Sequence, residues 1–240
     1  SADRLIGVAL LDAQDDVLLA SRSGKAIRFA GDDVREFQSR TSTGVRGMNL
    51  RDGDELVSLS ILHRIGTTAE EREDYLRFAP WKLAEREGEP TLAADRFAEL
   101  AEREQFILTV CANGYGKISS AYEYRRTGRG GQGIVNIDNI ERNGPVVASF
   151  PVRHGEQLML VTDQAKLIRL PLELRHLVDN ADSAEKAFRI IGRSSAGVRL
   201  FNVADGETIV SAARIDDTAE PETLAGEAVP ESDAQTGDVA

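Results

Sequence analysis

The chain has 240 residues, enough for one or two globular domains, and 41% hydrophobic with 29% charged residues is ordinary for a protein with an apolar core. No apolar run approaches the roughly 20 residues of a membrane-spanning helix, and no secretory signal pattern is visible. The lone cysteine, Cys111, lies in an apolar stretch, which favours a core position over a nucleophile. We therefore expect a cytoplasmic protein that does not contact a membrane.

The formal net charge of −11 is unevenly placed along the chain. Residues 216–240 hold eight acidic residues and no Lys or Arg, and residues 64–104 hold eleven acidic and seven basic residues. With these two segments set aside, the rest of the chain has a net charge of +1. The acidic total therefore does not exclude a polyanionic partner.

The chain begins with an apolar stretch, Leu5–Leu10, that predicts a strand, and a template then follows three times. The copies cover residues 17–62, 106–152 and 158–215. Each has an apolar strand, a short turn and a second strand with basic residues. Next comes an irregular stretch ending in glycine plus a β-branched residue, and a glycine turn before a closing strand.

The template predicts an all-β fold of propeller type. Short apolar runs with Asn-Gly or Asp-Gly turns indicate antiparallel hairpins, and repeats of about 45 to 50 residues indicate blades around an axis. Three blades rarely close a ring, so we expect the trailing part of a longer disc. The predicted organisation is a series of blades and insertions in chain order: a blade at 1–62, a helical insertion at 63–104, blades at 105–152 and 153–215, and a disordered acidic tail at 216–240.

The insertion at 63–104 predicts a helical hairpin on the surface. Thr67 or Thr68 is followed three residues later by glutamate, a capping-box pattern, and Pro80 kinks or ends that helix. A second helix is expected after Pro90 with Thr91 as its cap. We expect packing and no catalytic role from this segment.

The basic, glycine-rich stretch at 125–137 is the strongest candidate for binding. Its glycines let the backbone turn tightly and approach a partner, and its arginines suit phosphates. A plain turn with solvated arginines is the alternative. The stretch contains GxGxxG at 128–133, but it leads into a strand, whereas a dinucleotide site needs a following helix.

No set of residues in the sequence has a catalytic or metal-binding pattern. The three histidines, His63, His154 and His176, lie far apart in sequence and lack metal-type spacing. Neither a phosphate-binding GxxxxGK[ST] motif nor a GxSxG motif occurs. We therefore expect no catalytic residue and no cofactor in this chain.

Four motifs together resemble one family, the C-terminal DNA-wrapping domain of the A subunit of bacterial DNA gyrase. They are Thr43–Met48, Asn113–Lys117, Gly131–Ile134 and Glu141–Gly144. The resemblance implies a six-bladed β-pinwheel of which this chain holds roughly the last three blades. The family's signature box, Gln-(Arg/Lys)-Arg-Gly-Gly-(Arg/Lys)-Gly, is echoed only in part at 127–133, so we expect the true box upstream of this chain.

The resemblance also implies a function. The outer rim of the blades would bind and bend duplex DNA so that the holoenzyme introduces negative supercoils. ATP and Mg²⁺ would serve that holoenzyme, an A₂B₂ heterotetramer of two gyrase A and two gyrase B polypeptides. The residues expected to contact phosphates without base readout share one curved edge. They are Lys25, Arg28, Arg46, Lys117, Arg125, Arg126, Arg129, Lys166, Arg169, Arg193 and Arg199.

Two other functions are compatible with the sequence. The equivalent domain of topoisomerase IV would favour decatenation, and a propeller-like scaffold would bind proteins rather than DNA. The overall acidity of the chain favours the scaffold, and the basic, glycine-rich stretch favours DNA.

The acidic residues at 216–240 generate a prediction. An anionic segment tethered beside a cationic rim competes with DNA at a high effective concentration. We expect deletion of residues 216–240 to tighten binding of duplex DNA in an equilibrium titration. Unchanged affinity at low salt would remove the idea of competition.

Overall fold

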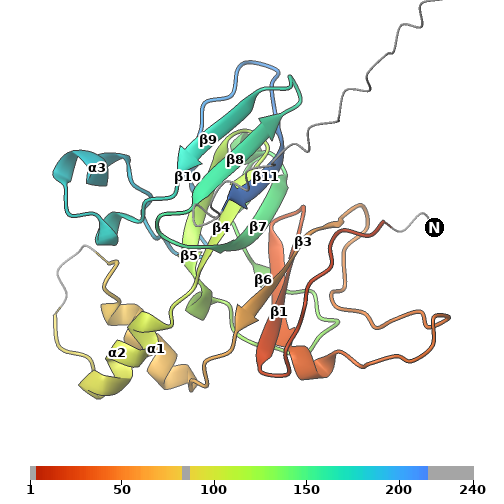
Figure 1. The fold of residues 1–240 in the computed structure, drawn as a ribbon, viewed down its shortest axis with the longest axis horizontal. Helices are drawn as coiled ribbons and strands as arrows, with labels where there is room; N and C mark the ends of the chain where they lie inside the picture. The colour runs from red at the N-terminus through yellow and green to blue at the C-terminus, as the bar shows by residue number, and fades with distance from the viewer. Residues whose placement is uncertain (1–3, 83–86, 216–240) are drawn as a thin grey trace, which may run out of the picture.

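The computed structural model describes residues 4–82 and 87–215 (Figure 1), so the predicted tail at 216–240 lies outside the described residues. The strands and α-helices follow one another in an order that repeats a β-hairpin and a closing strand. They are β1 (Asp15–Ser21), β2 (Lys25–Ala30), β3 (Leu56–His63), α1 (Ala69–Phe78), α2 (Ala94–Glu102), β4 (Phe106–Cys111), β5 (Tyr115–Ser120), β6 (Ile134–Val135), β7 (Val146–Val152), β8 (Gln157–Thr162), β9 (Leu167–Pro171), α3 (Ala181–Lys186), β10 (Val198–Arg199) and β11 (Ile209–Ile215).

The strands form three small antiparallel sheets, which confirms the predicted fold class. Their strand orders are β3-β1-β2-β6, β10-β5-β4-β7 and β11-β8-β9. The fourth strand of each four-stranded sheet comes from the next repeat along the chain: β6 pairs with β2 through Lys25 and Val135, and β10 pairs with β5 through Tyr115 and Arg199. The next repeat therefore supplies the fourth strand of each of the first two sheets. The repeat boundaries in the sequence do not indicate this strand exchange.

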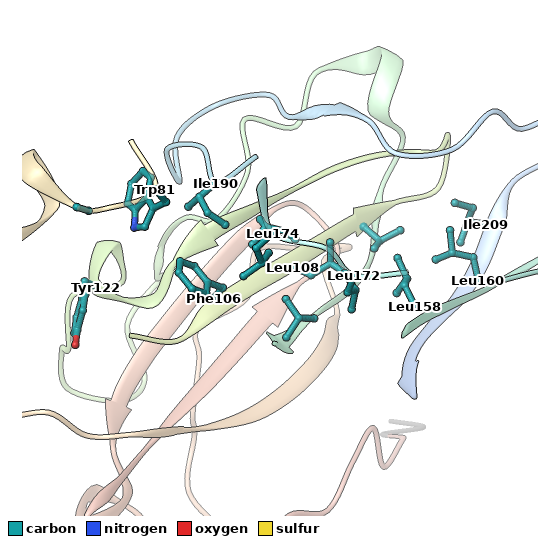
Figure 2. Close-up of a cluster of buried hydrophobic side chains, with 14 of the residues drawn as sticks. Trp81, Phe106, Leu108, Tyr122, Leu158, Leu160, Leu172, Leu174, Ile190 and Ile209 are labelled. Carbon is teal, nitrogen blue, oxygen red and sulfur yellow. The ribbon is translucent and has the colours of Figure 1, made fainter. Parts of the chain in front are cut away.

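The closing strands of the three sheets, β3, β7 and β11, lie next to one another on one side of the fold. Strand β3 packs against β7, and β7 packs against β11 (Figure 1). We call this side the inner edge, and we call the opposite side, with β6, β10 and β9, the outer edge. The largest apolar cluster joins the second and third sheets through residues such as Leu108, Leu158, Leu160 and Leu172 (Figure 2).

The first helix of the insertion begins and ends as predicted. The side chain of Thr68 accepts a hydrogen bond from the Glu71 amide while the Glu71 carboxylate accepts from the Thr68 amide, and the helix ends two residues before Pro80. Thr91, however, does not cap α2. The Asp74 carboxylate accepts the amides of Thr91 and Leu92, which ties this segment to α1, and α2 starts only at Ala94 without a side-chain cap.

A partly buried carboxylate, that of Glu104, fastens the insertion to the second sheet. Glu104 accepts hydrogen bonds from the Tyr75 hydroxyl at 2.7 Å, from Trp81 Nε1 at 3.0 Å and from the Ser120 hydroxyl. Burial raises the pKa of Glu104, and these three donors oppose that change. One carboxylate thus satisfies donors from two elements of the insertion and one strand of the sheet, which fixes their relative position.

The expected strand at Leu5–Leu10 is wrong. This segment is not assigned to any strand, and Leu5 and Leu10 are 82% and 97% exposed. In each repeat a closing strand pairs with the first strand of its own sheet, as β3 does with β1. Among the described residues, no strand lies beside Leu5–Leu10 in this way, so the backbone of this segment is not paired with any described strand.

The strand exchange can be tested at Gly133, which has a φ of +74°. A Cβ there would lie 2.5 Å from the carbonyl oxygen of Ala26 on β2. Gly53 is a matched control, because its φ is +78° and nothing lies within 4 Å of an added Cβ. We expect Gly53→Ala to cost about 1–2 kcal/mol of unfolding free energy from backbone strain alone, and Gly133→Ala to cost clearly more. Chemical denaturation measures both, and equal losses would contradict the close approach of β6 to β2.

Candidate nucleic-acid interface

The glycine-rich loop at 125–133 lies on the outer edge of the first sheet, against the loop at 46–49. The amide of Asn49 donates to the Gly131 carbonyl at 2.8 Å, and the amide of Gly130 donates to the Gly47 carbonyl at 2.6 Å. Two irregular stretches from neighbouring repeats are thereby held together. Their arginines form what we call the first basic patch, which consists of Arg46, Arg125, Arg126 and Arg129.

The first basic patch keeps its charge available. All four side chains belong to exposed residues. Within residues 4–82 and 87–215, Arg46, Arg125 and Arg126 form no ion pair, and Arg129 donates only to the backbone carbonyls of Asp33 and Arg46, at 2.9 and 3.2 Å. Neutral acceptors orient a guanidinium without cancelling its charge, so this patch suits phosphates. Lys25 is half-buried beside it, at the start of β2.

A second group of cations surrounds Tyr115 on the outer edge of the second sheet. The guanidinium groups of Arg142 and Arg199 each lie 4.9 Å from the centre of the Tyr115 ring. Arg199 also donates to the Tyr115 hydroxyl at 2.6 Å. We call Arg142 and Arg199 the second basic patch. Arg142 is missing from the residues selected by sequence, although it belongs to the motif Glu141–Gly144.

The third sheet offers less free charge at its outer edge. Lys166 is exposed but forms an ion pair with Glu207 at 2.7 Å, and the Glu207 side chain is 2% exposed. Arg169 is exposed on β9. The positive charge is therefore concentrated over the first and second sheets.

Lys117 does not lie on the outer edge, which corrects the expectation from sequence. It is 1% exposed, and its ammonium donates to the carbonyls of Gly192, Arg193 and Ser195. Burial lowers the pKa of Lys117 to about 7. The strand register explains this position, because Lys117 occupies the inward-facing site that Ile27 and Ile168 occupy in the other repeats.

Arg28 and Arg193 also make internal contacts. The guanidinium of Arg28 pairs with Asp16 at 2.8 Å and donates to the Ala121 carbonyl at 3.0 Å, and burial lowers its pKa against the effect of Asp16. Arg193 donates to the carbonyls of Glu123 and Val135. Both residues join neighbouring repeats, so their first role is to hold the sheets together.

The structure shows no metal centre and no membrane-spanning helix in the part of the chain that it describes. No group of three or more His, Cys, Asp or Glu residues there could hold a metal ion, and no helix there is long and apolar enough to cross a bilayer. Cys111 is fully buried, and burial raises the pKa of its thiol to about 12, which confirms a core position.

Comparison with known families gives one matching family model, described as "DNA gyrase C-terminal domain, beta-propeller". It matches residues 15–63, 105–153, 156–174 and 184–216, which is more than half of the chain. The gap in the match between 63 and 105 corresponds to the insertion with α1 and α2.

Among curated relatives, the chain is similar to two proteins that are each named as the A subunit of DNA gyrase. The one from Granulibacter bethesdensis is 46% identical over 232 residues, which cover 87% of this chain and 23% of the relative. The one from Rickettsia felis is 43% identical over 230 residues, which cover 92% of this chain and 24% of the relative. The chain thus spans about a quarter of the length of these relatives.

Among solved structures, the fold is similar to a crystal structure of the C-terminal domain of DNA topoisomerase IV. The TM-score is 0.58 at 17% identity, over 88% of this chain and 49% of that one. This likeness supports the fold of packed β-blades.

The Lys166 ion pair generates a prediction about pH. Hydrogen bonds from Lys166 and then Thr162 lower the pKa of Glu207 from 4.5 to about 2. A carboxyl with a lowered folded-state pKa stabilises the fold above its unfolded-state pKa, and that stabilisation is lost as the pH falls through the folded-state pKa. We expect Lys166→Met to reduce the free energy of unfolding near neutral pH, and the difference from wild type to shrink between pH 4.5 and about pH 2. Denaturant titrations across that range measure it, and a constant difference would contradict the pairing.

Proposed function

This chain belongs to the family of DNA gyrase C-terminal domains, and we propose that it binds duplex DNA along the outer edge of its sheets. The observation that carries the proposal is the pair of basic patches on consecutive sheets, whose guanidinium groups are exposed and have no carboxylate partner within the described residues. Charges placed in this way neutralise phosphates irrespective of base sequence.

The repeat supplies the curvature that bending requires. Strand exchange fixes each sheet relative to the next, so the two basic patches are held at a set spacing around the fold. Bending a duplex by 40–90° over 20–30 base pairs costs roughly 1–6 kcal/mol. Several distributed phosphate contacts on a rigid curved edge can offset that cost, whereas one isolated patch binds DNA without bending it.

The proposal extends to a longer protein, because this chain spans about a quarter of the length of relatives that are named as the A subunit of DNA gyrase. We assign this chain to the DNA-wrapping part of such a protein. Wrapping would present a DNA segment to an A₂B₂ enzyme in the bacterial cytoplasm, which would introduce negative supercoils with ATP and Mg²⁺ held outside this chain. This proposal can be tested by deleting residues 1–240 of this chain from the complete protein. The deletion should abolish negative supercoiling of plasmid DNA and leave relaxation of supercoiled DNA intact.

A part of topoisomerase IV is the second candidate, since the similar solved fold comes from that enzyme. The two functions separate in one assay on the complete protein with its partner polypeptide. Net negative supercoiling of relaxed plasmid supports the gyrase function, and decatenation without negative supercoiling supports the other.

The interface itself can be tested by removing charge from two places. We expect the double variant Arg125→Gln and Arg126→Gln to weaken binding of a short duplex about tenfold. The slope of log K against log salt should fall in magnitude by about 2, because each phosphate contact contributes about 0.9.

The matched control removes two charges from the insertion, with Arg77→Gln and Lys82→Gln. Its affinity and salt slope should stay close to those of the wild type. Equal weakening by both double variants would mean that only the total charge matters, and an unchanged first variant would favour a protein-binding scaffold.

A further inference from the structure

A cavity of about 640 Å³ lies where the helical insertion meets the inner edge of the sheets. Its walls come from the ends of α1 and α2, from the last residues of β3, β7 and β11, and from the turn at 175–177. The closing strands converge there, so residues from three repeats line one space. This space is lined by different residues from those of the two basic patches.

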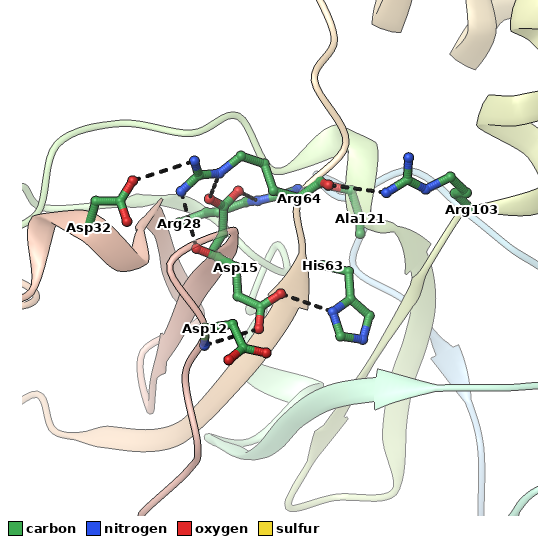
Figure 3. A network of polar contacts seen from close by, with 9 residues as sticks. Asp12, Asp15, Arg28, Asp32, His63, Arg64, Arg103 and Ala121 are labelled. Carbon is green, nitrogen blue, oxygen red and sulfur yellow. Dashed lines mark hydrogen bonds and ion pairs between the residues drawn. The ribbon is translucent and has the colours of Figure 1, made fainter.

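All three histidines of the chain line this cavity, although they are far apart in sequence. The Nδ1 atom of His63 lies 2.9 Å from Asp15, and Figure 3 shows the imidazole turned toward that carboxylate. The Nδ1 atom of His154 accepts the amide of Leu174 at 3.0 Å, so in neutral His154 the proton is on Nε2 and can be donated. The Nδ1 atom of His176 is buried and has no hydrogen-bond partner among the described residues.

Three arginines belong to the same walls: Arg103, Arg153 and Arg214. Arg103 pairs with Glu99 and Arg214 pairs with Glu156, each at 3.4 Å. Within the ranges 4–82 and 87–215, the guanidinium of Arg153 has no hydrogen-bond or ion-pair partner. Of the two carboxylates at the walls, Glu104 is occupied by its three donors from the insertion and the second sheet, and Glu102 is exposed. Among the described residues, the Arg153 guanidinium and the Nε2 proton of neutral His154 are therefore the donors left for a ligand.

The remaining wall is apolar and partly aromatic. Trp81, Phe106 and Leu174 belong to the large apolar cluster (Figure 2), and each also lines the cavity. The ring of His176 lies 5.7 Å from that of Phe106, centre to centre. Trp81 and Phe106 are 7% and 8% exposed, and these exposed parts offer aromatic contact to a flat apolar group, next to the Nε2 donor of His154 and the Arg153 guanidinium.

We propose that this cavity binds a small phosphorylated molecule with a flat apolar group, of the size and chemistry of a nucleotide. Arg153 and the histidines receive the phosphate, and the wall of Trp81 and Phe106 receives the ring. Ligand sites of this kind have volumes of about 300–1,000 Å³ and combine apolar walls with a few convergent polar groups. In this proposal the insertion has a function, because it supplies one wall of the site. The bound ligand would hold the insertion against the inner edge.

The chain contains its own reporter, since Trp81 is its only tryptophan. We expect adenosine monophosphate to change the Trp81 fluorescence in a saturable way, with higher affinity than inorganic phosphate, which lacks the flat group. Arg153→Gln should weaken that affinity at least tenfold, and His176→Gln should weaken it as a second variant. Arg125→Gln removes an exposed arginine from the first basic patch and should leave the affinity unchanged.

Three results would overturn the proposal. The first is the absence of a saturable fluorescence change with the nucleotide, or equal affinity for nucleotide and phosphate. The second is equal weakening by Arg125→Gln and Arg153→Gln. The third is a short DNA duplex that displaces the nucleotide from the wild type and binds less well to Arg153→Gln, since the cavity would then belong to the DNA surface.

Discussion

The fold depends on the exchange of a short strand between consecutive repeats. Strands β6 and β10 are only two residues long, so their pairing with β2 and β5 adds few hydrogen bonds. Buried cations reinforce it: the Lys117 ammonium reaches three carbonyls at 192–195 from the second sheet. A buried ammonium is costly unless its donors are satisfied, so this contact specifies one position of the next repeat. The residues that the sequence suggested as DNA contacts thus fall into two groups. One group makes contacts between neighbouring repeats, and the other is exposed on the outer edge.

This division explains how an acidic chain can present a basic surface. Arg28 and Lys166 are paired with carboxylates, and the insertion carries its own acidic excess. The first basic patch instead donates to neutral carbonyls or to no described residue, so its charge is available to a polyanion. The placement of charge, rather than its total, sets the field that a phosphate backbone meets.

Much of the fold was predictable because it is local and repeated. Hairpin turns, the capping box at Thr68 and the buried Cys111 follow from short-range patterns. The strand exchange and the meeting of three histidines depend on contacts between repeats, which no local pattern encodes. Lys117 could have been recognised in part. Alignment of the repeats places it where both other copies have isoleucine, which indicates a buried position, but its charge instead suggested a surface residue.

The central claim is that DNA lies along the outer edge, over both basic patches at once. Chemical modification of arginine side chains, mapped by mass spectrometry with and without duplex DNA, tests it most directly. We expect DNA to protect Arg46, Arg126 and Arg199 together and to leave Arg77 on the insertion equally reactive. Protection of Arg77 with continued reactivity of the two patches would contradict the claim.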